Sequence, residues 1–389
     1  MKEPQFKFKK KTNKKIHISF FIGSLEIGGT EKQFINIINS LDQKKFKIDL
    51  HLLSSKKGQL FKELESNITV FLPKFKFKSF LKHIFNFIVS FFRIRRTKPE
   101  IIHCFLPHAY LIAGLIGFLN NHKNIIMSRR SLNNYQQNFK LIPVKKIELF
   151  LHKRIKFIIV NARAVRENII NEGAPEKIVK LIYNGFIKPE SEQNVLPDNF
   201  KKKLGIKKNT FVFLVLANLI PYKNHKLVID AVDELRKFVK TQFKVIFLGS
   251  GKNEYKQYLK SLIKEKKIEN YFIFKNRTKY IKKFLDITNV GISSSLEEGL
   301  SNSLIELISH GITTIATNVG GNSEITNNRN GFLIESNNKD QLVKAMKTIL
   351  SNKNLLKRKS LQSKKDSKKF CLNEMVKNHI TIYENLITN

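Results

Sequence analysis

Three glutamates stand close together in residues 297–306, which read EEGLSNSLIE, although basic residues outnumber acidic ones by 71 to 31 in the 389-residue chain. If Glu298 and Glu306 shared one helix, they would lie about 12 Å apart along its axis. The paired carboxylates of a glycoside hydrolase need a separation of roughly 5–9.5 Å. We therefore expect the two glutamates to act on different parts of a ligand and not as one acid–base pair.

The residues around these glutamates favour a loop that leads into a helix. Glu298 is expected in the loop after a strand at 290–294, and Glu306 about two turns into the following helix. Carboxylates so placed can accept hydrogen bonds from hydroxyls at opposite ends of an elongated ligand, with the amide groups of residues 300–302 between them. A nucleotide sugar has this form. Acidic residues that merely complement a helix N-terminus would explain Glu297 and Glu298, but not Glu306.

Two glycines follow the first expected strand, in GSLEIGGTEKQF (23–34). Thr30 and Gln33 predict a capping box that opens a helix. Gly28 and Gly29, just before that helix, would let backbone amides approach an anion closely. The structural alternative is a tight strand–helix turn.

A similar arrangement is expected in the second half of the chain, where Lys223 follows Pro221 between a strand and a helix. A cation beside a helix N-terminus suits a phosphate, and a solvated lysine is the alternative. Gly249 and Gly251 follow the next strong strand. Neither a P-loop nor a G-x-G-x-x-G dinucleotide fingerprint occurs.

Short apolar runs alternate with helical patterns along the chain, which predicts parallel α/β sheets covered on both faces. The expected strands are 16–22, 48–53, 68–72, 101–105, 124–128, 157–160, 211–217, 244–249, 271–274, 290–294, 313–317 and 331–334. The pattern occurs twice, so we expect an α/β protein with two Rossmann-like, doubly wound domains that face a central cleft.

The domain boundaries follow from a proline-containing polar stretch in the middle of the chain. We expect an N-terminal, acceptor-side domain at 1–188 that begins with a basic tail (1–15), a linker at 189–206 and a nucleotide-sugar-binding domain at 207–370. Residues 371–389 are expected to form a C-terminal helix, with packing back on the N-terminal domain as one option.

Composition narrows the setting. The two cysteines, Cys104 and Cys371, are far apart and give neither a disulfide framework nor metal-ligand spacing, so a reducing, cytoplasmic compartment fits. No window holds 18 uninterrupted apolar residues, and no transmembrane helix is expected. The net charge of +40 favours nucleic acid, an anionic membrane or anionic substrates as partners, with codon bias as the alternative.

With these features together, the chain resembles the family-four retaining glycosyltransferases, which have the GT-B fold and an E-x7-E signature. Glu298 and Glu306 match the signature. Further segments match the family's motifs in order and spacing: GGTE (28–31), NGF (184–186), VLANLIPYKNHKLVIDA (215–231) and TNVGGNSEITNNRNGFLI (317–334). The resemblance extends from about residue 16 to about residue 350.

The resemblance implies a role for each matching residue. Glu306 would hold the ribose, Glu298 the donor sugar, and Lys223 the diphosphate, helped by backbone at Gly28 and Gly29. The full donor-binding set expected is Gly28, Gly29, Asn218, Lys223, Gly249, Leu300, Ser301, Asn302 and Glu306. Asn218 stands where many members have an arginine, and Ser301 replaces a common proline. The co-substrate implied is a nucleotide sugar, with a UDP-sugar as first choice.

The catalytic residues are less well specified than the donor site. Besides Glu298, we expect His108 after the fourth strand and Arg129 after the fifth, near the place where some relatives have a catalytic histidine. His103 is expected to face the cleft, with packing as the alternative. No D-x-D motif occurs, so no metal or other cofactor is expected, and leaving-group charge would be met by Lys223 and helix N-termini.

Residues 74–96, KFKFKSFLKHIFNFIVSFFRIRR, are basic and aromatic and contain no acidic residue. As a helix they place polar residues in one narrow stripe, at Lys78, Lys82, Asn86, Ser90 and Arg93. The stretch is either a buried helix or a surface that docks on an anionic membrane.

The sequence thus favours an enzyme that moves a sugar from a nucleotide sugar to a glycan or lipid-linked acceptor in cell-surface polysaccharide or glycolipid synthesis. A nucleotide-sugar epimerase with a GT-B-like fold is an alternative enzyme. A basic nucleic-acid-binding protein is an alternative of another class, although no binding motif supports a specific nucleic acid.

Overall fold

The structure is a computed structural model that describes residues 15–73, 80–132, 144–187 and 197–388. Its chain forms two compact units. The first unit contains residues 1–128, 146–158 and 378–389, and the second contains 129–145 and 159–377.

The two sheets have the same strand order, which confirms the expected pair of Rossmann-like sheets. The order is β3-β2-β1-β4-β5-β6-β7 in one and β10-β9-β8-β11-β12-β13 in the other, and neighbouring strands pair in parallel from β3 to β5 in the first sheet and from β10 to β13 in the second. The strands are β1 Ile16–Ile22, β2 Phe46–Leu52, β3 Thr69–Phe71, β4 Ile101–Phe105, β5 Ile125–Arg129, β6 Phe157–Val160, β7 Val179–Leu181, β8 Phe211–Leu216, β9 Phe243–Leu248, β10 Phe272–Lys275, β11 Val290–Ser293, β12 Thr313–Thr317 and β13 Gly331–Ile334.

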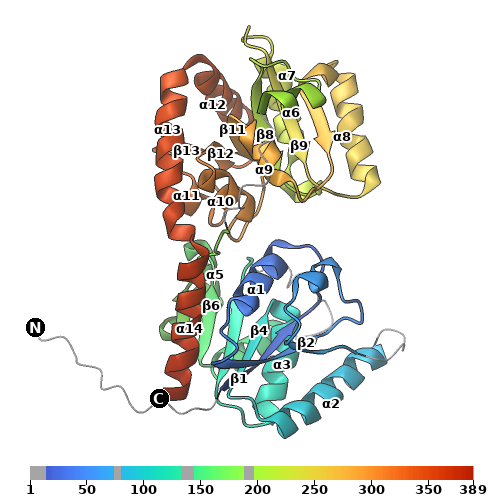
Figure 1. Ribbon diagram of the computed structural model, residues 1–389, viewed down its shortest axis with the longest axis vertical. Helices are drawn as coiled ribbons and strands as arrows, with labels where there is room; N and C mark the ends of the chain where they lie inside the picture. Colours follow the sequence, from blue (N-terminus) through green and yellow to red (C-terminus); the bar gives the residue numbers. More distant parts are fainter. Residues whose placement is uncertain (1–14, 74–79, 133–143, 188–196, 389) are drawn as a thin grey trace, which may run out of the picture. The chain divides into compact units, whose positions relative to one another are not determined.

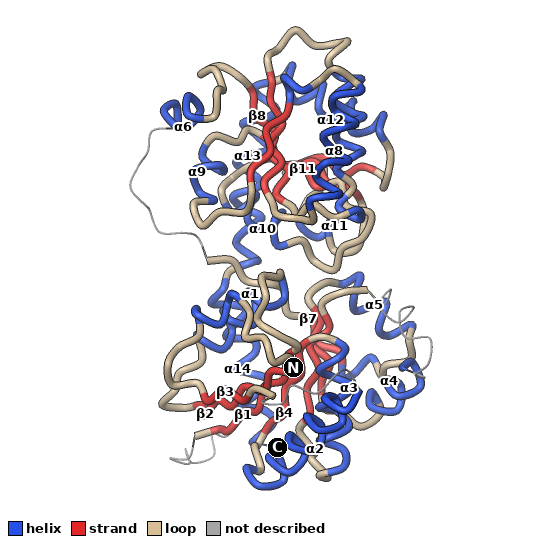
Figure 2. The backbone as a smooth tube through the Cα atoms, turned by 90° about the vertical axis from the view of Figure 1, so that its right-hand side faces the viewer, coloured by secondary structure: helices blue, strands red, loops and turns tan. Residues whose placement is uncertain are grey.

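Helices join successive strands, and Figures 1 and 2 show them around each sheet. Helix α7 packs against α8 and α12, and α10 packs against α11 and α13. The helices are α1 Gly29–Asn39, α2 Phe80–Thr97, α3 Pro107–Leu119, α4 Val144–His152, α5 Arg163–Asn171, α6 Pro197–Lys203, α7 His225–Leu235, α8 Asn253–Glu265, α9 Ile281–Asp286, α10 Asn302–Ser309, α11 Asn322–Ile325, α12 Lys339–Ser351, α13 Lys353–Asp366 and α14 Leu372–Thr388.

The strands predicted from apolar runs are present within a few residues of the expected bounds. Strand β7 was not predicted, because its three residues, VKL, include an exposed lysine and give no apolar run. Of the expected linker, residues 189–196 lie outside the described part, and 197–203 form α6. The domain boundaries expected at residues 188 and 207 stay a prediction.

The two sheets differ in what their strands bury. The core around β8–β13 is aliphatic and aromatic, as in Phe213, Val245 and Ile315. The strands β1 and β2 instead bury titratable groups. The Nε2 atom of His17 lies 3.0 Å from an Asp49 oxygen, and His51 stacks on Phe21 with ring centroids 4.2 Å apart.

The C-terminal helix α14 contributes to the core of the first unit through its last turns. The Tyr383 hydroxyl is 2.8 Å from Nδ1 of His103, and its ring packs edge-on against Phe20 and Phe46. Ser128 Oγ lies 2.8 Å from the other ring nitrogen of His103. His103 is therefore a fully buried core residue, and the expectation that it faces a cleft is wrong.

Candidate donor site

The local fold holds Lys223 at the start of a helix, as expected. After β8 the chain makes a short 3₁₀ turn, Pro221–Lys223, and the ring of Pro221 fixes the backbone of its first residue. Asn224 then takes a left-handed conformation (φ 50°), which Asn tolerates better than most residues, and is the N-cap of α7. The ammonium group thus lies one residue before a helix N-terminus, where the helix dipole is positive.

Lys223 and Glu298 meet in an ion pair. The Lys223 Nζ lies 2.5 Å from Oε1 of Glu298, and the two side chains are 16% and 11% exposed. Ser295 Oγ donates to the same carboxylate oxygen at 2.8 Å, and Ser294 Oγ donates to the Lys223 carbonyl at 2.9 Å. The two loops, one before α7 and one after β11, are therefore joined by both a charge pair and a hydroxyl contact.

The neighbouring His225 is neutral near pH 7. Its side chain is fully buried as the first residue of α7. Burial, and then the charge of Lys223, lower the pKa of His225 to about 4. Lys223 is thus positively charged at this helix start, whereas the adjacent His225 is not.

Two glycines outside the expected site hold the Glu298 loop in place. Gly320 has φ +50°, and a Cβ at this position would overlap the carbonyl oxygen of Glu298. The amide of Gly321 donates to the Gly299 carbonyl at 2.7 Å. The glycine pair of the 317–334 segment therefore positions the glutamate loop by close backbone contact.

Helix α10 begins directly after this loop. Ser301 is its N-cap, and its side chain accepts a hydrogen bond from the Leu304 amide. Asn302 accepts a hydrogen bond at 2.7 Å from Asn184, a residue of the NGF segment. Glu306 is half-buried in α10. It is the fifth helical residue and so a little more than one turn into the helix, not two.

Gly249 and Asn218 lie together at the ends of β9 and β8. A Cβ on Gly249 would overlap the Ala217 carbonyl and lie 3.1 Å from the Asn218 amide. Asn218 itself is exposed. Leu300 is buried and touches the place where a Cβ of Gly321 would sit, at 2.9 Å. Gly249 and Leu300 thus have packing roles in addition to the donor contacts expected of them.

Gly28, Gly29 and His108 belong to the first unit. Gly28 is the N-cap of α1 and Gly29 its first residue, so the helix begins before Thr30, and the predicted capping box is wrong. His108 is exposed in the first turn of α3. Because β1 and β4 are paired, these residues follow neighbouring strands at the same edge of the sheet.

Arg129 is fully buried at the end of β5. Its guanidinium lies 3.1 Å from the Glu172 carboxylate, and its Nε donates to the Ser131 carbonyl at 3.0 Å. This pairing holds the chain after the strand, and the side chain has none of the exposure that contact with a substrate requires. A catalytic role for Arg129 stays a prediction.

Sequence reasoning missed three residues that shape the site. Ser295 contacts Glu298, Gly320 supports its loop, and Glu324 joins α11 to the segment before α5. Glu324 accepts hydrogen bonds from the Arg163 amide at 2.7 Å and from the Tyr183 hydroxyl at 2.8 Å. Burial and the nearby carboxylate raise the pKa of Tyr183 to about 12. The T-x-x-G-G-x-x-E segment, which contains Gly320 and Glu324, was the available signal.

The described residues include neither a metal-binding cluster nor a membrane-spanning helix. Within them, no group of three or more His, Cys, Asp or Glu side chains is arranged to hold a metal ion. None of the described helices combines the length and hydrophobicity needed to cross a bilayer.

The chain matches two family models in succession. Residues 27–187 match the model described as Glycosyltransferase Family 4, and residues 197–366 match Glycosyl transferases group 1. The chain belongs to the family-four glycosyltransferases. Glu298 and Glu306, the residues of the expected E-x7-E signature, lie in the second matched segment, and the two glycines of GGTE lie in the first.

Similar proteins cover most of the chain. The capsular polysaccharide biosynthesis glycosyltransferase CapH of Staphylococcus aureus is 25% identical over 92% of this chain and 96% of its own. An Escherichia coli galactosyltransferase that uses UDP-Gal and GlcNAc-diphosphoundecaprenol is 23% identical over 88% and 90%. The crystal structure of HepE from Anabaena in complex with UDP superposes with a TM-score of 0.79 at 18% identity, covering 96% of this chain and all of HepE. That superposition confirms the fold.

Proposed function

We propose that this glycosyltransferase moves a sugar from a UDP-sugar to a lipid-linked or glycan acceptor, with retention of anomeric configuration and without a divalent metal. The observation that carries the proposal is the Lys223–Glu298 pair between the start of α7 and the loop before α10. Relatives named for UDP-sugar donors and diphosphoundecaprenol acceptors support the choice of substrates.

The arrangement assigns a task to each group of a bound donor. The Lys223 ammonium and the first-turn amides of α7 and α10 provide positive charge for the diphosphate. Glu298 accepts hydrogen bonds from sugar hydroxyls, and Glu306 from the ribose. In the free enzyme the carboxylate of Glu298 holds the Lys223 ammonium, so a bound diphosphate competes with this carboxylate for the cation.

Lys223 also provides a route to leaving-group stabilisation without a metal. As the sugar–phosphate bond breaks, negative charge grows on the diphosphate, and a fixed cation at a helix N-terminus lowers the energy of that state. We expect transfer to continue in excess EDTA. Activity that disappears with EDTA and returns with magnesium or manganese would show that a metal supplies this charge.

Donor identity can be tested on the purified protein. UDP-, GDP- and ADP-sugars are compared in a thermal-shift assay, because a ligand that binds the folded state stabilises it by mass action. We expect UDP-sugars alone to raise the melting temperature, and the sugar that does so then serves in a transfer assay. A response to GDP- or ADP-sugars instead would overturn the choice of nucleotide.

The acceptor is proposed to be reached at a membrane surface, because helix α2 exposes an apolar face. Ile84, Ile88, Val89 and Phe92 are 41%, 44%, 41% and 62% exposed. Residues 74–79 and the side chains of 80–83 lie outside the described part of the stretch.

Two residues of the polar stripe expected on α2, Asn86 and Arg93, face inward and not toward solvent. Asn86 is buried, and the Arg93 guanidinium lies 3.6 Å from the centroid of the Phe71 ring. Burial lowers the pKa of Arg93, whereas the charge of Asp49 raises it. The contact with Phe71 and the charge of Asp49 both favour the inward position of this arginine, and the apolar residues Ile84, Ile88, Val89 and Phe92 are left exposed.

An anionic leaflet is the partner that fits this face. Arg95 and Arg96 are exposed at its end, and each basic residue near such a surface contributes about 1 kcal/mol. We propose a peripheral location on the cytoplasmic face of a membrane.

Sedimentation with vesicles tests the docking. We expect binding to phosphatidylglycerol vesicles that weakens with salt, is absent for phosphatidylcholine, and falls at least fivefold in Ile88→Ser/Phe92→Ser. The double variant Phe238→Ser/Leu361→Ser, also exposed but in the second unit, is the control. If wild type ignores anionic vesicles at low salt, a soluble acceptor becomes the better proposal.

A further inference from the structure

A pocket of about 320 Å³ lies in the first unit, away from every residue assigned to the donor site. It is formed where α3 ends, where α4 ends and where β5 and β6 begin. In a parallel α/β sheet, substrates bind at the carboxyl ends of the strands. This pocket is at the opposite, amino-terminal edge, so the transfer reaction does not account for it.

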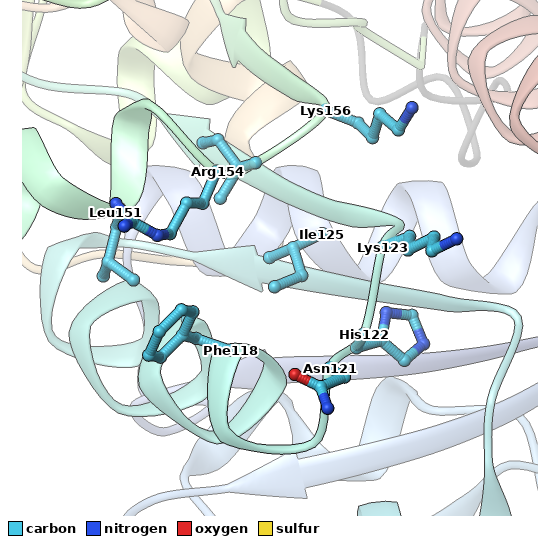
Figure 3. A pocket seen from close by; sticks show the side chains of 10 residues that line it. Phe118, Asn121, His122, Lys123, Ile125, Leu151, Arg154 and Lys156 are labelled. Carbon is cyan, nitrogen blue, oxygen red and sulfur yellow. The ribbon is translucent and has the colours of Figure 1, made fainter.

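The pocket combines an apolar floor with cations. Phe118, Ile125 and Leu151 line it together with Lys123, Arg154 and Lys156. Figure 3 shows both lysines extending to one side and Arg154 with Phe118 at the other. None of the ten described residues that line it is Asp or Glu.

Aromatic rings fix Arg154 in place. Its guanidinium carbon lies 3.7 Å from the centroid of the Phe150 ring and 5.3 Å from that of Phe118, and these two rings meet edge to face. One of its terminal nitrogens donates to the Phe150 carbonyl at 3.1 Å. Burial lowers the pKa of His122, and its Nε2 lies 2.7 Å from the Pro99 carbonyl oxygen. The guanidinium of Arg154, positioned by the two rings, together with the exposed Lys123 and Lys156, suits an anion with several oxygens.

The surroundings of the pocket are apolar as well. Phe118 and the adjacent Leu119 are 38% and 54% exposed at the end of α3. Helix α2 lies beside α3 in Figures 1 and 2, and Asn120 donates to the Phe91 carbonyl of α2. The pocket therefore adjoins the helix whose apolar face is exposed. An anion held here would have its apolar part close to hydrocarbon-like side chains.

We propose that this pocket binds the phosphate head group of an anionic phospholipid, with the glycerol and the start of the acyl chains against Phe118 and Leu119. Lys123, Lys156 and Arg154 provide positive charge for the phosphodiester, and the buried Ile125 and Leu151 form the base of the pocket beneath it. The inference rests on the proposed membrane docking for the source of the lipid. It adds a specific site to a surface that would otherwise attract anionic lipids only by general charge.

Short-chain phosphatidylglycerol, kept below its critical micelle concentration, tests the site without a bilayer. We expect it to raise the melting temperature of the wild type. In Lys123→Gln/Lys156→Gln, the same rise should require a lipid concentration at least ten times higher. The control is Lys56→Gln/Lys62→Gln, which removes the same charge from exposed lysines of the same unit near the other ends of the strands. Inorganic phosphate and short-chain phosphatidylcholine are run alongside.

Two outcomes of this assay would overturn the proposed lipid site. An equal response to inorganic phosphate would assign the pocket to a free anion and overturn the lipid proposal. An equal loss in the control variant would reduce it to general charge and overturn it as well. Because this assay needs neither vesicles nor donor, a failed transfer reaction or a failed α2 docking leaves its outcome unaffected. Without ligand, the pocket variants should unfold as cooperatively as the wild type and at a similar temperature, which shows that they fold.

Discussion

The two sheets have one strand order but place their chemistry differently. In the second unit the strands β8–β13 bury apolar, threonine and serine side chains but no titratable ones, and the charged residues Lys223 and Glu298 come from the loops that follow strands. In the first unit, titratable residues such as His17, Asp49 and His51 lie within the strands themselves. The same topology thus carries a site at the ends of its strands in one case and a polar interior in the other.

This difference separates two kinds of substitution. Changes in the loops of the second unit should reduce activity while the fold is retained, because the strands below are held by apolar packing. Changes within β1 and β2 should act on stability and its pH dependence. The predictions below test that separation.

Lys223→Ala should have the largest effect. Removing a cation that stabilises the departing diphosphate is expected to cost about 2–4 kcal/mol, or about a 30- to 900-fold fall in kcat/KM. The control is Lys226→Ala, whose exposed pair with Asp230 contributes little. An unchanged kcat/KM in Lys223→Ala would remove this lysine from the mechanism.

Gly320→Ala should lower kcat/KM by about 10- to 100-fold, because the added Cβ displaces the Glu298 backbone and small misplacements are costly in catalysis. Gly205→Ala is the matched control. Its φ of +69° imposes similar backbone strain, but a Cβ there meets nothing within 4 Å. If both variants lose activity equally, strain alone explains the effect, and contact with the glutamate loop does not matter.

The two signature glutamates should divide their effects. Glu306→Ala is expected to weaken binding of UDP itself by about tenfold, the value of one hydrogen bond to a charged group. Glu298→Ala should spare or strengthen UDP binding, because it frees Lys223 from its ion pair, yet it should impair transfer. Calorimetric titration with UDP measures the first effect, and equal losses in both variants would reject the division.

Acid should destabilise the first unit through His51. Burial lowers the pKa of His51 from 6.5 to about 3, so the folded state resists protonation. The contribution of this neutral histidine to the free energy of unfolding is fully present above pH 6.5. As the pH falls from 6.5 toward 3, the free energy of unfolding decreases by about 1.4 kcal/mol per pH unit. Denaturant unfolding between pH 7.5 and 4 should show a slope smaller by that amount in His51→Phe. A wild-type slope in His51→Phe would place the acid response elsewhere.

The strands and the lysine–glutamate loops could be predicted from sequence because their signals are local. A buried parallel strand is a short apolar run, and the E-x7-E spacing lies within one loop and helix. The helix start at Gly28 was missed because two helix-start signals compete within three residues, and the backbone of Gly28 is used in place of the Thr30 side chain.

Other features depend on partners far away in the chain. His103 is in the core because Tyr383, 280 residues later, reaches its ring. Arg129 is closed off by Glu172, and Gly320 touches Glu298 across a turn that no spacing rule describes. Arg93 turns inward where it meets the Phe71 ring of β3 and the charge of Asp49 in β2. A single sequence shows the residue types but not these pairings.

The position of Tyr383 near the end of the chain has a consequence for biosynthesis. The strands of the first unit are made first, yet Phe20, Phe46 and His103 gain their cover only when the last turns of α14 have been synthesised. The second unit, complete by residue 377, can fold while the first still exposes aromatic side chains. The first unit, most of which is translated earliest, is therefore the unit whose packing is completed last, and a chaperone would have to shield its exposed aromatic side chains.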